Sequence, residues 1–256
     1  MPREAMAKTD PAPQPTLASQ TSTSEPWVAQ DGRRSGSEFV ENLGRNCVGV
    51  FSQDNLQTFL IGTGATVSAR LLDDKSQRFF GGQRRAKWLG DTAEQFGRMR
   101  FVAPATLILY GLGRASHDQT FRDASYDIAQ TTILTAAFTV AIKTSAHRLR
   151  PDGSNYRSFP SGHSSNSFAW ATVFNHFYGP AAGIPAYGIA GLVGIGRMEK
   201  NVHYLSDVVA GAALGILISR TVIRKNDEPL PGTTVTTGGL PPALRSRPLI
   251  QASIDF

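Results

Sequence analysis

Lys143 and Arg150 are two cationic residues whose spacing suggests an anion-binding site. They are seven residues apart, which is about two helical turns, so a helix over 126–149 would bring both side chains to one face near its end. Pro151 is expected to stop that helix. Two cations directed at one point repel each other unless an anion lies between them. Taken alone, the pair is better explained by solvated charges at a helix end.

A second group, Pro160-Ser161-Gly162-His163, comes just before a run at 164–177 that is predicted to be helical. The first N–H groups of a helix have no partner within it and the helix dipole is positive there, so an anion binds readily. Gly162 lets that anion approach the backbone closely, and His163 adds a titratable imidazole. An ordinary N-cap at Ser161 or Ser164 with a surface histidine explains the four residues equally well.

The third group consists of Arg197, His203 and Asp207, at the start of a predicted helix over 204–223. His203 and Asp207 are four residues apart, so the carboxylate can accept the Nδ1 proton of the imidazole. Nε2 is then left as an electron-pair donor, which is the arrangement of a histidine nucleophile. A simple surface pair is the preferred interpretation of these residues in isolation.

The order and spacing of the three groups together resemble the type 2 phosphatidic acid phosphatase and vanadium haloperoxidase superfamily. The matching pattern is Lys143 with six residues to Arg150-Pro151, then Pro160 to His163, then Arg197 with five residues to His203 and three to Asp207. The resemblance covers roughly residues 120–223 and leaves both ends of the chain unexplained.

This resemblance implies a role for each motif residue. Lys143, Arg150 and Arg197 would bind the phosphate oxygens, helped by Ser161 and the backbone at Gly162. His203 would attack phosphorus and form a phosphohistidine while Asp207 orients it, and His163 would protonate the leaving group and then activate water. Three cations and a helix terminus can stabilise a transferring phosphoryl group, so no metal and no cofactor is expected.

One position departs from the family pattern. Gly196 stands where many members have Ser before the arginine, which puts the supporting contacts of that hydroxyl in doubt. His147 is predicted to share a helical face with Lys143 and Arg150, although a helix-end histidine is the favoured interpretation. Arg157 is close enough in sequence to gate the site, but this is not favoured.

The fold class predicted from the sequence is all-α, a single bundle of about six core helices with the active site at one end. Charge-free stretches recur at 55–69, 101–113, 128–142 and 208–219, and 158–196 is expected to divide into two helices around Gly179, Pro180 and Pro185. Residues 1–36 and 227–256 have the composition of flexible or irregular tails, which leaves 37–226 as the helical domain.

Composition limits the partners without identifying one. The net charge of +6 favours anionic partners in general, but the short basic cluster at 84–87 has no recognition motif around it, so nucleic acid is not expected. With 41% hydrophobic residues and a mean hydropathy of -0.18, composition does not indicate a polytopic membrane protein. No signal peptide is visible, and the resemblance implies a place in the cell envelope, either membrane-associated or periplasmic. The oligomeric state is not predicted.

Several activities are compatible with these motifs. The favoured one is a phosphomonoesterase that acts on a lipid or polyprenyl phosphate. Alternatives are a soluble nonspecific acid phosphatase, a haloperoxidase in which His203 holds vanadate, and a non-catalytic binder of phosphate or phospholipid. The occupied catalytic positions argue against the last, and the compact spacing of nine residues from Pro151 to Pro160 resembles bacterial phosphatases.

Overall fold

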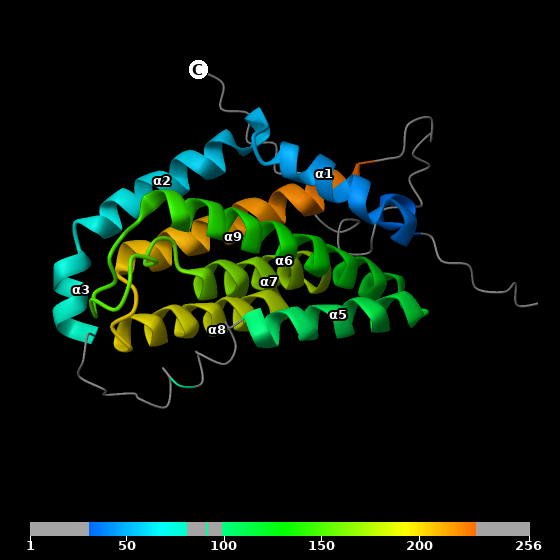
Figure 1. The fold of residues 1–256 in the computed structure, drawn as a ribbon. Coiled ribbons are helices and arrows are strands. Elements are labelled where there is room, and N and C mark those ends of the chain that lie inside the picture. Colours follow the sequence, from blue (N-terminus) through cyan, green and yellow to red (C-terminus); the bar gives the residue numbers. More distant parts are fainter. Residues whose placement is uncertain (1–30, 81–90, 92–98, 229–256) are drawn as a thin grey trace, which may run out of the picture.

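The computed structural model describes residues 31–80, 91 and 99–228, and these form helices and short turns with no strand. The all-α prediction is confirmed. The α-helices are α1 (Phe39–Gly49), α2 (Leu56–Arg70), α3 (Asp73–Phe80), α5 (Met99–Ala115), α6 (Gln119–Ala146), α7 (Gly162–Tyr178), α8 (Pro180–Glu199) and α9 (Leu205–Asp227), with 3-10 turns at Gly32–Arg34, Gly36–Glu38 and Gln53–Asn55. The helices from α5 to α9 lie lengthwise beside one another (Figure 1).

The six expected core helices correspond to α2 and α5 to α9. The division of 158–196 is confirmed at Gly179-Pro180, where α7 ends and α8 begins, but Pro185 lies inside α8. The helices α1 and α3 are additional to the predicted ones, because both contain charged residues and charge-free stretches do not indicate them. The predicted 126–149 helix is also misplaced, since α6 begins at Gln119 and ends at Ala146.

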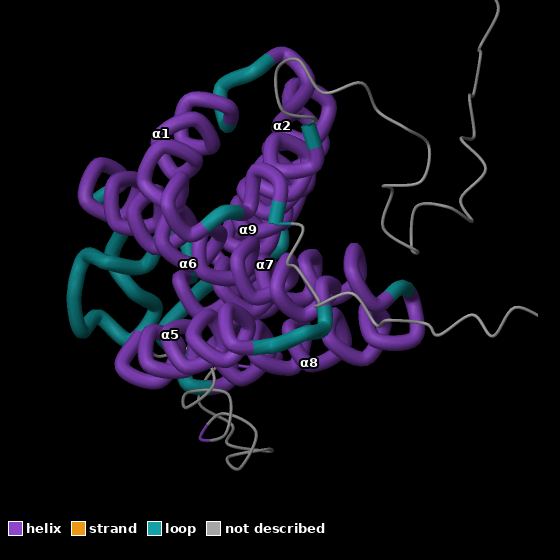
Figure 2. The backbone as a smooth tube through the Cα atoms, turned by 90° about the vertical axis from the view of Figure 1, so that its right-hand side faces the viewer, coloured by secondary structure: helices purple, strands orange, loops and turns teal. Residues whose placement is uncertain are grey.

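Helix α7 occupies the centre of the bundle and packs against α6, α8 and α9 (Figure 2). Its approach to α9 depends on two glycines of α9. A Cβ at Gly211 would lie 2.5 Å from the carbonyl oxygen of Ser161, and one at Gly215 would lie 2.2 Å from that of Ser165. Neither position has room for a side chain, so the glycines bring α9 against the start of α7.

The N-terminal boundary of the folded region is earlier than predicted. Residues 31–36 were expected to belong to a flexible tail, yet Arg34 is only 5% exposed. Its guanidinium forms two hydrogen bonds with the carboxylate of Asp127, at 3.0 and 2.8 Å, and one with Asp227 at 2.7 Å. Residues 1–30 and 229–256, where the rest of the predicted tails fall, lie outside the described residues.

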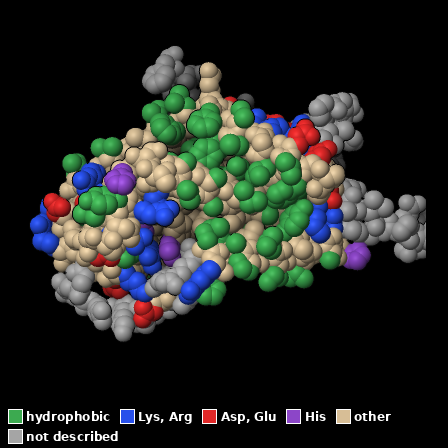
Figure 3. Space-filling view, viewed as in Figure 1, with side chains coloured by type: hydrophobic (Ala, Val, Ile, Leu, Met, Phe, Trp, Pro, Cys, Tyr) green, Lys and Arg blue, Asp and Glu red, His purple; other side chains and the backbone are tan. Residues whose placement is uncertain are grey.

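The outer surface of the bundle is rich in exposed hydrophobic side chains. Phe59, Leu60 and Ile61 of α2 and Leu107 and Ile108 of α5 are all more than half exposed. Figure 3 shows hydrophobic side chains over the middle of one face, while Lys, Arg and His side chains gather toward the end that carries α3. Among the described residues α9 alone is long and apolar enough to cross a membrane, and 56% of its most apolar window is buried, as in a core helix.

Candidate active site

Ser161 begins the candidate site as the N-cap of the central helix α7. Its Oγ accepts a hydrogen bond from the N–H of Ser164 at 3.4 Å, and its own N–H donates to the carbonyl oxygen of Asp207 at 2.9 Å. Gly162 and His163 are the first two residues of the helix. The N-cap interpretation of Ser161 is therefore correct, and it places the motif at a helix start where the dipole favours an anion.

Lys143 reaches the same loop from the last turn of α6. Its Nζ donates to the carbonyl oxygens of Arg157 at 2.6 Å and Pro160 at 2.8 Å. Burial, followed by the charge of Arg150, lowers the pKa of Lys143 to about 8. A half-buried ammonium next to another cation gains stability when an anion binds near both.

Arg150 joins Lys143 by a different route from the one predicted. Because α6 ends at Ala146 and His147 has a φ of 42°, Arg150 does not continue a helical face. It lies in a turn in which its N–H donates to the carbonyl oxygen of Asn155 at 3.0 Å. Its charge is nevertheless the largest single charge effect on Lys143. The two cations are brought together by a loop.

His203 lies just before α9, and only 4% of it is exposed. Its Nδ1 is 3.7 Å from Oδ2 of Asp207, an ion-pair distance longer than a hydrogen bond. Burial lowers the pKa of His203 to about 4, and the positive charges of Lys143 and Arg197 act in the same direction while Asp207 opposes them. The imidazole is therefore neutral near pH 7, as a nucleophile requires.

Arg197 completes the set of three cations from the last turn of α8, where it is 6% exposed. Its charge acts on both Lys143 and His203, so the three side chains share one site although they come from different elements. The preceding Gly196 is buried, and its carbonyl oxygen accepts a hydrogen bond from the N–H of Lys200 at 3.1 Å.

The groups that hold Asp207 are not among the residues predicted from the sequence. Its carboxylate accepts hydrogen bonds from Ser158 Oγ at 2.5 Å, from Arg148 Nη1 at 2.5 Å and from the N–H of Tyr204 at 2.9 Å. Arg148 also donates to Asp73 of α3 at 2.7 Å. Arg148 lies between Lys143 and Arg150, and Ser158 lies two residues before Pro160, so both are close to the motifs, whereas nothing in the sequence points to Asp73.

Two nearby residues lie at the edge of this arrangement. His147 is exposed, and its ring stacks on Tyr156 with centroids 4.8 Å apart and an interplanar angle of 8°. Arg157 is also exposed and contributes its carbonyl oxygen to Lys143. Among the described residues no group of three or more His, Cys, Asp or Glu side chains is arranged to hold a metal ion.

Comparison with known sequences agrees with this geometry. The sequence model of the PAP2 superfamily matches residues 126–228, which contain every motif residue from Lys143 to Asp207. This part of the chain is therefore similar to the PAP2 superfamily. The lipid A 1-phosphatase of Porphyromonas gingivalis is 38% identical over 117 residues, which cover 44% of this chain and 26% of that protein.

A PA-phosphatase related-family protein of Dictyostelium discoideum is 32% identical over 43% of this chain and 50% of its own length. The chain thus spans about a quarter of the length of the Porphyromonas gingivalis protein and half of the length of the Dictyostelium discoideum protein. Two crystal structures share the fold at 22% identity. The first transmembrane PAP2 type phosphatidylglycerolphosphate phosphatase from Bacillus subtilis has a TM-score of 0.54, covering 68% of this chain and 96% of its own. Aquifex aeolicus LpxE has a TM-score of 0.50, covering 60% and 95%.

Proposed function

We propose that this chain is a metal-independent phosphomonoesterase that acts on a lipid phosphate through a phosphohistidine intermediate. The observation that carries the proposal is the set of three cations, Lys143, Arg150 and Arg197, around the buried His203, whose pKa is lowered to about 4. Lys143 also donates to the carbonyl oxygen of Pro160, which comes just before the start of α7. Phosphoryl transfer depends mostly on positioning and on stabilising the charge of the phosphoryl oxygens, and this arrangement supplies both.

In the first half of the reaction the cations and Ser161 orient the phosphoryl group so that Nε2 of His203 faces phosphorus. Nε2 forms a bond to phosphorus while the bond from phosphorus to the ester oxygen breaks. His163 donates its proton to the departing alkoxide. The phosphorylated imidazole becomes positively charged, and the carboxylate of Asp207 stabilises that charge and keeps Nδ1 protonated.

In the second half His163, now neutral, accepts a proton from a water molecule. The oxygen of that water bonds to phosphorus while the bond to His203 Nε2 breaks, which releases inorganic phosphate and restores both histidines. The pocket binds a dianionic product with the same cations that bound the substrate, so inorganic phosphate is expected to inhibit.

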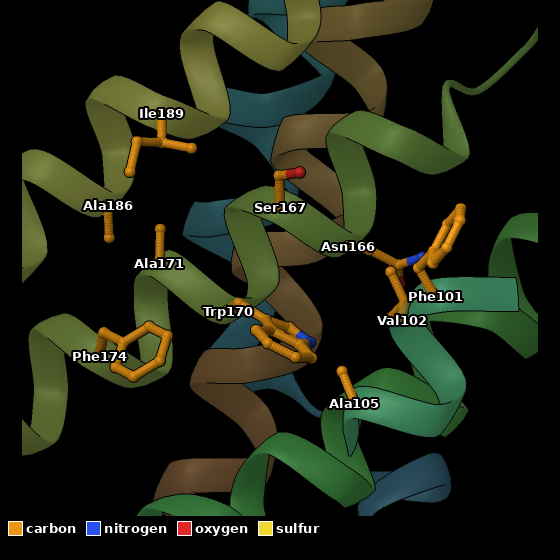
Figure 4. A pocket seen from close by; sticks show the side chains of 10 residues that line it. All are labelled: Phe101, Val102, Ala105, Asn166, Ser167, Trp170, Ala171, Phe174, Ala186 and Ile189. Carbon is orange, nitrogen blue, oxygen red and sulfur yellow. The ribbon is translucent and has the colours of Figure 1, made fainter. Parts of the chain in front are cut away.

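The shape of the bundle favours a substrate with an apolar tail. A cavity of about 590 Å³ lies over α7, between α5 and α8, and we call it the α7 groove. Figure 4 shows its lining, which is Phe101, Val102 and Ala105 of α5, Asn166, Ser167, Trp170, Ala171 and Phe174 of α7, and Ala186 and Ile189 of α8. The indole N–H of Trp170 donates to Thr132 Oγ1 at 2.9 Å, so its polar atom is satisfied elsewhere.

The α7 groove starts one helical turn from the site, because Asn166 follows His163 by three residues. From Asn166 to Phe174 it extends about 12 Å along the helix at 1.5 Å per residue. A long, mainly apolar cavity beside a phosphate site fits an acyl or prenyl chain. The exposed hydrophobic surface of α2 and α5 gives the same protein a face that can contact membrane lipid. We therefore favour a membrane-associated enzyme of the cell envelope.

The experiment is hydrolysis of phosphatidic acid and of p-nitrophenyl phosphate by the purified chain, with His203→Ala as the test variant. His203→Ala is expected to lower kcat by at least about 10⁴-fold while inorganic phosphate still binds, because the cations remain. His117→Ala, an exposed histidine before α6, is the matched control and should keep full activity.

Trapping a base-stable, acid-labile phosphoenzyme that is absent from His203→Ala would support the intermediate directly. Phosphate binding without turnover in the natural chain would contradict the enzyme proposal. Bromination of monochlorodimedone with vanadate and peroxide, in a protein inactive on phosphate esters, would replace the phosphatase with a haloperoxidase.

A further inference from the structure

Both carboxylate oxygens of Asp207 accept hydrogen bonds, and the donors come from different segments of the chain. Ser158 Oγ and the N–H of Tyr204 donate to Oδ2, the oxygen nearest His203, at 2.5 and 2.9 Å. Arg148 Nη1 donates to the other oxygen, Oδ1, at 2.5 Å. Because both oxygens are engaged, the carboxylate plane is fixed, and the direction in which it faces the imidazole is fixed with it.

Arg148 is itself held between two carboxylates. Its Nη1 bonds Asp207 and Ser206 Oγ, at 2.5 and 2.7 Å, while Nη2 bonds Asp73 Oδ2 at 2.7 Å. The guanidinium also lies over the ring of Tyr204, 4.1 Å from its centroid. A planar, five-donor guanidinium can bridge two carboxylates in this way, whereas a lysine ammonium cannot reproduce the geometry.

Asp73 anchors this arrangement from outside the matched PAP2 region. It is 1% exposed, and its carboxylate accepts hydrogen bonds from the N–H and the Oγ of Ser206, at 2.9 and 2.7 Å, and from Arg70 at 2.8 Å. Ser206 is the second residue of α9. Asp73 therefore satisfies an amide of the first turn of the helix that carries Asp207, a role normally taken by a residue of the same helix.

We propose that Asp73 is a positioning residue for the reaction, acting through Arg148 and Ser206 to fix the Asp207 carboxylate against His203. The helix α3 would then be part of the catalytic machinery, although it lies some 50 residues before the matched region. This inference rests on the proposed phosphatase activity. In this proposal Asp73 does not contact the substrate, so replacing Asp73 should leave the phosphate-binding residues in place.

The test is a double-mutant cycle with Asp73→Asn and Arg148→Lys, assayed on p-nitrophenyl phosphate. Each single variant is expected to lower kcat by about 10- to 100-fold, the usual effect of removing a group that orients a functional residue. The inhibition constant of inorganic phosphate should change less than twofold. Rates are expressed per phosphate-binding site, counted by calorimetry, so that a partly unfolded sample does not imitate the effect.

The double variant distinguishes positioning from general loss of stability. If Asp73 acts through Arg148, the double variant loses no more than the worse single variant, because the two residues form one unit. Asp74→Asn changes the exposed neighbour of Asp73 on the same helix and should keep wild-type kcat. Losses that multiply in the double variant, or wild-type kcat in Asp73→Asn, would overturn the proposal.

Ser206→Ala covers the case in which Asp73→Asn fails to fold. It removes only the hydroxyl that bonds both Asp73 and Arg148, and leaves their direct hydrogen bond in place. A severalfold loss of kcat that disappears in the Arg148→Lys background is expected. Independent losses would again reject the positioning role. A wild-type chain without phosphatase activity would instead contradict the proposed function, so the two failures are distinguishable.

Discussion

Nδ1 of His203 lies 3.7 Å from Oδ2 of Asp207, and the two residues are on opposite sides of a helix start. His203 precedes α9, whereas Asp207 is its third residue and accepts the N–H of the N-cap residue Tyr204 at 2.9 Å. Asp207 therefore caps α9 and faces the imidazole with the same oxygen. A change that disturbs the start of α9 should disturb the position of His203 against Asp207 as well.

The pH dependence of kcat/KM is expected to reflect the charge states of His203 and Lys143 beside that of the general acid His163. His203 must be neutral to attack, and its pKa of about 4 means that activity falls only as the pH drops through that value. Lys143 must be charged to bind the substrate, and its pKa of about 8 means that activity falls as the pH rises through that value. A bell-shaped dependence of kcat/KM on pH, with a plateau between about pH 4 and about pH 8, is therefore expected for the free enzyme.

Lys143→Arg separates the contribution of Lys143 from that of His163. A guanidinium stays protonated throughout this range, so the alkaline fall should move to higher pH in the variant. The profile is measured with p-nitrophenyl phosphate and compared with the ionisation of the substrate itself. An alkaline limb that is identical in wild type and Lys143→Arg would mean that His163 controls it.

Removal of metal ions is expected to leave activity unchanged. In the proposed mechanism, Lys143, Arg150 and Arg197 would provide the positive charge that a divalent ion supplies in other phosphatases. Turnover is measured after dialysis against EDTA, with and without added Mg²⁺ or Zn²⁺, and should agree within about twofold if no Lewis acid takes part. Loss of activity that the metal restores would refute metal independence.

The helix positions of the candidate site residues were predictable from sequence because these residues stand in short local motifs. Gly162 and His163 stand at the first positions of α7, and the predicted helices over 164–177 and 204–223 are α7 and α9 to within a few residues. Local signals such as a Pro-Ser-Gly run before an apolar stretch are sufficient there.

What could not be predicted depends on contacts between distant parts of the chain. The αL conformation of His147 ends α6 early, and a non-glycine residue gives no sequence signal for it. Arg34 is buried because Asp127, 93 residues away, provides its counter-ion. Asp73 meets Ser206 across 133 residues. Charged residues outside any motif are predicted to be exposed to solvent. Their partners, which are distant in sequence, become known only from the folded structure.

The α7 groove gives a prediction about the length of the substrate tail. Ala186→Phe places a ring in the groove and should lower kcat/KM for long-chain phosphatidic acid by about tenfold or more, since each CH₂ excluded from an apolar site costs about 0.8 kcal/mol. Hydrolysis of p-nitrophenyl phosphate, which has no acyl chain, should be unchanged.

Ala181→Phe is the matched control, because Ala181 is exposed on the same helix and does not line the groove. It should leave the activity on both substrates at the wild-type level. If Ala186→Phe lowers both activities equally, the ring has disturbed the fold or the phosphate site, and the groove does not hold the chain.

Arg34 gives a prediction about stability that is separate from catalysis. Arg34→Met leaves Asp127 buried without its cation and should lower the free energy of unfolding by about 3–5 kcal/mol. Replacing both partners, in Arg34→Met with Asp127→Leu, should recover part of that loss, because no unpaired charge then remains at Asp127. Thermal unfolding in detergent measures the stability of the single and the double variant.

The same substitution should leave kcat of the folded fraction unchanged. Arg34 lies near the start of α6 and the end of α9, whereas the proposed catalytic groups lie at the end of α6 and the start of α9. A lower kcat with normal stability would instead link the buried cluster to the active site.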